Sequence, residues 1–190
     1  MEIARAKAQE DPRFHVLELG ADTPGRPSVG RARDVGARHG RSLFPDVPGE
    51  RLWVASTDAD TRVPPGWLTG LAVLGTGVDV EDPRGALVLG TVDLAGADPA
   101  LRQAWAAEYE HREGHGHVHG ANMGLTWAQY EALGGVSHCA EHEDVRLAEA
   151  ARAHGVPVVA TDRVRVATSA RLDGRSPGGF AGYLAALPVH

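Results

Sequence analysis

Short apolar runs that alternate with amphipathic stretches most constrain how this chain of 190 residues can fold. LWVAST at 52–57 and ALVLGTV at 86–92 have strand length, and PVVATDRVRVAT at 157–168 is one bent strand or two short ones. The segments between them have the apolar spacing of helices, which is typical of an α/β layered domain. We therefore predict a three-layer α/β sandwich around a mixed, mostly parallel sheet.

The remaining elements follow from the same periodicity and from turn residues. A further strand is expected at 14–19 (FHVLEL), and a helix should begin at the paired Pro64 and Pro65 and continue through Leu74. Other helices are expected at 2–10, 29–39, 98–112, 126–133, 143–154 and 178–187. A chain of this length suits one domain, and no repeat or linker divides it.

Composition excludes several classes of protein. The formal charge of -6, with no Lys/Arg-rich run, has the wrong sign for a nucleic-acid partner. The single cysteine, Cys139, excludes an intramolecular disulfide and fits a reducing compartment. No stretch approaches the roughly 18 apolar residues of a membrane span. We predict a cytoplasmic protein without a transmembrane segment.

Two aspartates separated by one small residue, Asp58 and Asp60, follow the run at 52–57. Ligands bind at such strand ends in α/β sheets. Residues at i and i+2 in extended chain lie on the same side, so both carboxylates can address one hard divalent cation or one set of sugar hydroxyls. Acidic turns after strands are also common, so a solvated turn is the alternative.

A second acidic pair, Glu143 and Asp144, opens the helix expected at 143–154. Such charges complement the helix dipole, a contribution of about 0.3–1 kcal/mol. The functional alternative is a carboxylate at the edge of a cleft that takes a proton from an attacking hydroxyl. Both interpretations predict the same local structure.

Histidines and arginines supply two further candidates. His115, His117 and His119 alternate as if along one strand face, which would suit zinc, although ten histidines in the chain point to general enrichment. We expect instead that His119, Gly120 and Asn122 line a polar pocket in which small residues let the backbone approach a ligand. Arg171 and Arg175 could clamp pyrophosphate oxygens or simply lie on a surface loop.

Taken in order, these segments resemble the later part of a bacterial, inverting family 2 glycosyltransferase with the GT-A fold. The resemblance rests on linked motifs: VGRARDVG at 29–36, TDADT followed by VPPGWL, HGANMGLTWAQYEALGG, EHEDVRL and TSARLDGR. It runs from about residue 14 to the end of the chain. It implies transfer of a sugar from a nucleotide-diphosphate sugar to an acceptor hydroxyl with inversion.

The resemblance also implies residue roles. Asp60 would be the main ligand of Mg²⁺ or Mn²⁺, and Asp58 would bind ribose or the metal. Asp144 would be the general base, and Glu143 would orient the acceptor or the base. The metal would stabilise charge on the departing diphosphate.

Family members open with a strand that ends in Pro-x-x-Asn-Glu, then a helix and a second strand, and these parts grip the base and ribose. This sequence contains none of them. We therefore expect residues 1–190 to be a single partial domain that lacks roughly the first quarter of the catalytic unit. A non-catalytic remnant or binding protein that retains the acceptor half is the alternative. A weaker one is a zinc hydrolase that uses His117, His119 and Asp144.

Overall fold

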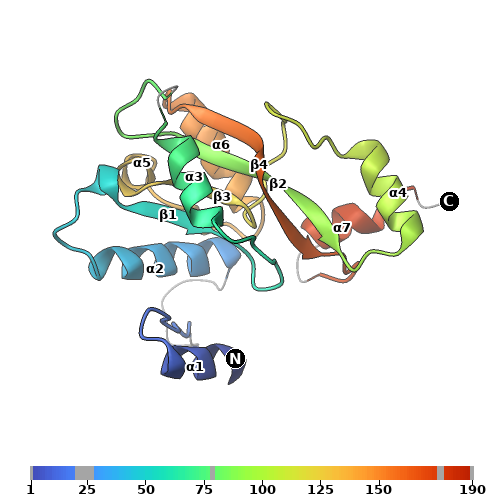
Figure 1. The fold of residues 1–190 in the computed structure, drawn as a ribbon, viewed down its shortest axis with the longest axis horizontal. Helices are drawn as coiled ribbons and strands as arrows, with labels where there is room; N and C mark the ends of the chain where they lie inside the picture. The colour runs from blue at the N-terminus through green and yellow to red at the C-terminus, as the bar shows by residue number, and fades with distance from the viewer. Residues whose placement is uncertain (1, 20–27, 78–79, 175–177, 189–190) are drawn as a thin grey trace.

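The computed structural model describes residues 2–19, 28–77, 80–174 and 178–188 (Figure 1). Within these residues the chain forms one open sheet of four strands. The strands are β1 (Trp53–Ser56), β2 (Leu87–Ala95), β3 (Met123–Thr126) and β4 (Val158–Ser169), and their order in the sheet is β1-β3-β2-β4. The protein therefore belongs to the α/β class and has a mixed sheet, as predicted.

The prediction of a mostly parallel sheet is wrong. Only β2 and β4 are parallel, whereas β3 is antiparallel to both β1 and β2. The reason is β3 itself, a four-residue strand with the sequence MGLT that the sequence analysis did not assign. It lies between β1 and β2 with the opposite direction, so two of the three pairings in the sheet are antiparallel.

Helices follow the predicted positions closely. They are α1 (Glu2–Glu10), α2 (Val29–Ser42), α3 (Trp67–Gly75), α4 (Pro99–Glu108), α5 (Trp127–Ala132), α6 (Glu143–Ala153) and α7 (Phe180–Ala185), with a short 3-10 turn at Gly49–Arg51. Side chains of Ser28, Asp98 and Thr126 cap α2, α4 and α5 by accepting a backbone N–H of the first turn. Pro64 and Pro65 precede α3, whose first residue follows Gly66.

Apolar side chains gather on both faces of the sheet. Val88 and Val92 of β2 pack on one face with Leu71 of α3 and with residues of α4 and α7. Leu87 and Leu89 point to the opposite face, where they meet residues of β3, α5 and α6. This alternation along β2 is the period of two that a strand imposes, and it buries the strand from both sides.

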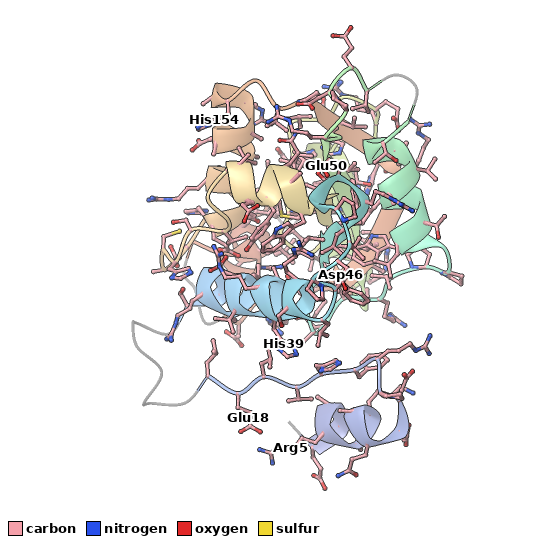
Figure 2. The ribbon with its side chains drawn as sticks, turned by 90° about the vertical axis from the view of Figure 1, so that its left-hand side faces the viewer. Arg5, Glu18, His39, Asp46, Glu50 and His154 are labelled. Carbon is pink, nitrogen blue, oxygen red and sulfur yellow. The ribbon has the colours of Figure 1, made fainter. Side chains whose placement is uncertain are left out.

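Residues 14–19 form no strand in this structure, contrary to the prediction. They run beside α1, outside α2, and no described strand lies next to them (Figure 2). The Arg5 guanidinium donates to the Glu18 carboxylate, and Lys7 lies over the ring of Phe14, so α1 and this segment contact each other. None of the described helices is long and apolar enough to cross a membrane.

Candidate functional site

A groove of about 770 Å³ is lined by residues of α2, β1 and the start of α6. Its walls are largely apolar and include Ala32, Ala37, Val54, Leu125 and Leu147. One group of polar side chains is found among the remaining lining residues: Arg33, Ser56, Thr57, Asp58, Glu143 and Asp144. Asp58, Glu143 and Asp144 are three of the residues that the sequence predicted as functional.

Arg33 of α2 is the centre of this polar group. Its Nε donates to Glu143 Oε1 at 3.1 Å, and its Nη2 donates to Asp58 Oδ1 at 2.5 Å. Its Nη1 donates to the carbonyl oxygen of Gly120 at 2.6 Å and also to Ser56 Oγ. Only 14% of the Arg33 side chain is exposed. One guanidinium therefore binds groups from β1, from the loop before β3 and from the start of α6.

Two glycines allow this close approach. A Cβ on Gly120 would lie 2.6 Å from Arg33 Nη2, so only glycine leaves room for the guanidinium over the backbone. A Cβ on Gly30, in the first turn of α2, would lie 2.0 Å from the carbonyl oxygen of Ser137. The absence of these side chains lets α2 approach two loops, the one before β3 at Gly120 and the one that leads to α6 at Ser137.

Asp144 occupies the second position of α6 and is half-buried at the groove. Its Oδ2 accepts the N–H of Gly120 at 2.7 Å, and its Oδ1 accepts the N–H of Val145 at 2.8 Å. Gly120 is thus held from both sides, by Arg33 at its carbonyl and by Asp144 at its N–H. The residue before α6, His142, has a φ of 62°, an uncommon conformation for a residue other than glycine.

Asp60 and Arg171 lie outside this group and bind each other. Asp60 Oδ2 and Arg171 Nη1 are 2.5 Å apart, and neither residue lines the groove. The loop after β1 is tied to β4 by a hydrogen bond from Thr61 Oγ1 to Thr168 Oγ1, 2.9 Å long. Arg175, the other predicted diphosphate ligand, lies outside the described residues.

His119 and Asn122 point away from the groove. His119 Nε2 is 2.9 Å from the hydroxyl oxygen of Tyr109, and burial lowers the pKa of His119 to about 3. Asn122 is completely buried, where its Oδ1 accepts the indole N–H of Trp67 and its Nδ2 donates to the carbonyl oxygens of Thr91 and Val164. Of the expected pocket segment, only Gly120 contacts the polar end of the groove.

The histidine run forms a stack of rings. The His117 ring lies on Tyr109 with 3.9 Å between centroids, and His119 stacks next to His117 at 6.1 Å. Among the described residues, no three His, Cys, Asp or Glu side chains come together in a way that could hold a metal ion. A zinc centre built from His117, His119 and Asp144 therefore has no support in this geometry.

Asp58 and Asp60 do not fit a divalent-cation site in this arrangement either. Each carboxylate bonds to an arginine, Asp58 to Arg33 and Asp60 to Arg171. A hard cation prefers several oxygen ligands, and a guanidinium bonded to each carboxylate competes for them.

Arg33 and Ser56 are the residues to which the sequence analysis assigned no role. Arg33 lies within the quoted VGRARDVG segment. One signal could have identified it: Arg33 is a charged residue among Val29, Ala32, Gly36 and Ala37 on the groove-facing side of the first turns of α2, whereas the other groove-lining arginine, Arg41, lies in its last turn. An arginine on an otherwise apolar helix face is retained mainly where acceptors surround it.

The fold and the groove define an α/β protein with an open mixed sheet and a carboxylate-rich site at one end of an apolar groove. No known protein family matches the chain, and no curated protein is significantly similar to it.

Proposed function

We propose that this chain is a glycosyltransferase domain of the inverting type, which transfers a sugar from a nucleotide-diphosphate sugar to an acceptor hydroxyl. One observation carries the proposal. Asp58, which follows β1, and Glu143, which opens α6, bind the same guanidinium, and Asp144 is linked to that guanidinium through Gly120. Asp58 of the first acidic motif and both carboxylates of the second thus lie at one end of one groove, whereas Asp60 lies outside it.

Asp144 is the general base in this proposal. Its carboxylate lies at the groove, and each of its oxygens accepts one backbone N–H, which fixes its orientation and leaves further lone pairs free. The acceptor hydroxyl would give its proton to this carboxylate while its oxygen bonds to the anomeric carbon. The bond to the diphosphate breaks on the opposite face, and the diphosphate leaves with the electron pair, so the anomeric configuration inverts.

Arg33 and Glu143 are positioning residues here. All three nitrogens of the Arg33 guanidinium donate to protein acceptors, so Arg33 orients the site rather than holding the leaving group. It fixes Gly120 between itself and Asp144. A displaced Gly120 would move the hydrogen bond that orients the base. Small displacements of this kind are costly for catalysis because the reacting groups must be held close to the productive geometry.

The test is turnover of nucleotide-sugars by wild type and by Asp144→Asn. Purified protein is incubated with a panel of UDP- and GDP-sugars and saccharide acceptors, and the released nucleoside diphosphate is measured. We expect Asp144→Asn to lose about 10²- to 10⁴-fold in rate and to keep the nucleotide affinity of wild type by calorimetry. Asp46→Asn, the same change at an exposed site, is the matched control. Wild-type rates from Asp144→Asn would remove Asp144 as the base.

A non-catalytic binding protein is a second candidate, favoured by the arginine partners of both Asp-x-Asp carboxylates. The same panel separates the two functions. Saccharide or nucleotide binding without consumption of any nucleotide-sugar supports the binding protein and overturns the transferase.

A further inference from the structure

The free edge of β1 is a site at which another strand can pair. β1 and β4 are the outer strands of the sheet, and β4 already has a partner, because the N–H and C=O of Arg62 exchange hydrogen bonds with Ala167. β1 contacts a strand on one side only, β3. Among the described residues, no strand lies on its other side.

The hydrogen-bond alternation shows which groups that edge presents. Trp127 donates its N–H to the carbonyl oxygen of Leu52 at 2.7 Å, and Trp53 is opposite Thr126 in the register. In an antiparallel pair, bonded and non-bonded positions alternate. Leu52, Val54 and Ser56 therefore face β3, and the N–H and C=O groups of Trp53 and Ala55 point to the free edge. An added strand would find two donors and two acceptors there.

Apolar surface adjoins this edge. The groove between β1 and α2 is lined by Leu52, Val54, Ala32, Ala37 and Phe44. A strand beside β1 would lay alternate side chains over this groove and remove them from water, at about 25 cal/mol per Å² of buried apolar surface. The edge thus combines main-chain pairing with side-chain burial, as strand addition requires.

The chain itself carries a segment of matching chemistry. Phe14–Leu19 (FHVLEL) has four apolar residues out of six and a composition typical of strands, yet it pairs with no described strand. Phe14 and Leu17 remain 52% and 41% exposed. His15 Nδ1 lies 3.2 Å from His39 Nε2 on α2, and His39 does not line the groove. Within one molecule, this segment is therefore held on α2 outside the groove (Figure 2).

We propose that Phe14–Leu19 of a second copy of this chain pairs with the free edge of β1, and that the two copies exchange these segments reciprocally. An exchange about a twofold axis gives a closed dimer, because each copy donates one strand and receives one. It pairs the free groups of Trp53 and Ala55 and covers the apolar groove with Leu17 and Leu19, which share one face of the donated strand. The inference does not depend on the proposed enzymatic activity.

The first experiment measures molar mass by light scattering after size exclusion, over a series of protein concentrations. We expect wild type to be a dimer and Leu17→Glu to be a monomer, because a carboxylate cannot be buried at the new interface without a partner. Leu43→Glu is the matched control: Leu43 has nearly the same exposure, 42%, and does not line the groove. It should remain dimeric. A monomeric wild type, or a dimeric Leu17→Glu, would overturn the proposal.

The second experiment locates the contact on β1. Ala55→Pro removes an N–H that faces the free edge and leaves the bonds of Val54 and Ser56 to β3 in place, so a folded variant should be monomeric. Amide hydrogen exchange in the wild type gives the same information without a substitution. The N–H groups of Trp53 and Ala55 should exchange slowly in the dimer and faster upon dilution. A dimer in which both amides exchange as quickly as exposed loops contradicts strand addition at β1.

Discussion

At the scale of single residues, the polar end of the groove depends on Arg33 and on the glycine beneath it. The guanidinium binds two carboxylates and a carbonyl from three separate segments, and Gly120 lies close enough that a side chain there would overlap it. Arginine suits this position because its planar fork donates in several directions at once, which a lysine cannot do.

Gly120→Ala tests that close approach. The added Cβ would lie 2.6 Å from Arg33 Nη2, so the guanidinium must shift away from its acceptors. We expect a loss of about 1–3 kcal/mol in the free energy of unfolding, measured by urea denaturation. Gly116→Ala, where nothing lies within 4 Å of the new Cβ, is the control and should change stability little. Equal effects of the two substitutions would show that Gly120 is not a tight contact.

Arg33 and Glu143 form a buried ion pair whose coupling a double-mutant cycle can measure. Arg33→Met leaves the largely buried Glu143 without its cationic partner, so we expect a loss of about 3–5 kcal/mol. Adding Glu143→Leu to that variant should restore a large part of the loss, because no buried carboxylate is then left unpaired at position 143. Simple addition of the two single effects would mean that the residues do not interact.

At the scale of elements, α2 is joined to the body of the protein through Asp34 as well as Arg33. Asp34 Oδ1 accepts the hydroxyl of Tyr130 at 2.7 Å, and Oδ2 accepts Arg38 Nε at 2.9 Å and lies 3.0 Å from His138 Nε2. Burial alone would raise the pKa of Asp34, but the hydrogen bonds from Arg38, Tyr130 and His138 outweigh it and hold the pKa below its ordinary value. The charged form of Asp34 therefore stabilises the docked helix.

Asp34→Asn should make this contribution visible as a function of pH. The pKa of Asp34 is lower in the folded chain than in the unfolded chain, where an aspartate titrates at about 3.9. The stabilisation is therefore complete at pH values above the unfolded pKa and is lost as the pH falls through the folded pKa. We expect the variant to have a lower Tm than wild type at neutral pH and the difference to shrink in acid. A pH-independent difference in Tm would contradict a role for the charge. Asp46→Asn, at an exposed site, serves as control.

At the scale of the whole molecule, the sheet separates two apolar cores, and the face with α3, α4 and α7 also contains the histidine stack. His119 lies there between Tyr109 and Phe180, and it stays neutral because burial lowers its pKa to about 3. An unfolded histidine titrates near 6.5. Between about pH 6.5 and pH 3 the unfolded chain therefore binds one more proton at this residue, so stability falls with falling pH.

His119→Gln removes that titration. We expect the free energy of unfolding of the variant to depend less steeply on pH below about 6.5 than that of wild type, as measured by urea denaturation at a series of pH values. His154→Gln replaces an exposed histidine and should keep the wild-type slope. If the His119 and His154 variants gave the same slope as wild type, the buried neutral imidazole would not contribute to acid sensitivity.

The sequence by itself determined the features that depend on neighbouring residues. Within the described residues, apolar periodicity and turn residues predicted all seven helices and the strands β1, β2 and β4, because burial patterns and caps act within a few residues of one another. It also predicted that Asp58, Asp60 and Asp144 converge on one cleft. Asp58 and Asp144 line one groove, whereas Asp60 lies outside it and binds Arg171.

Only the tertiary structure decided the direction of β3, the isolation of residues 14–19 and the partners of the charged side chains. A four-residue strand such as MGLT carries no signal of its direction, since direction depends on which strands lie beside it. In the same way, Asp58 and Asp60 are alike in sequence, yet one binds Arg33 and the other Arg171. Periodicity reports which face of an element is buried. Which partner lies across that face depends on contacts between residues far apart in the chain, because close packing and ion pairing must both be favourable in the same arrangement.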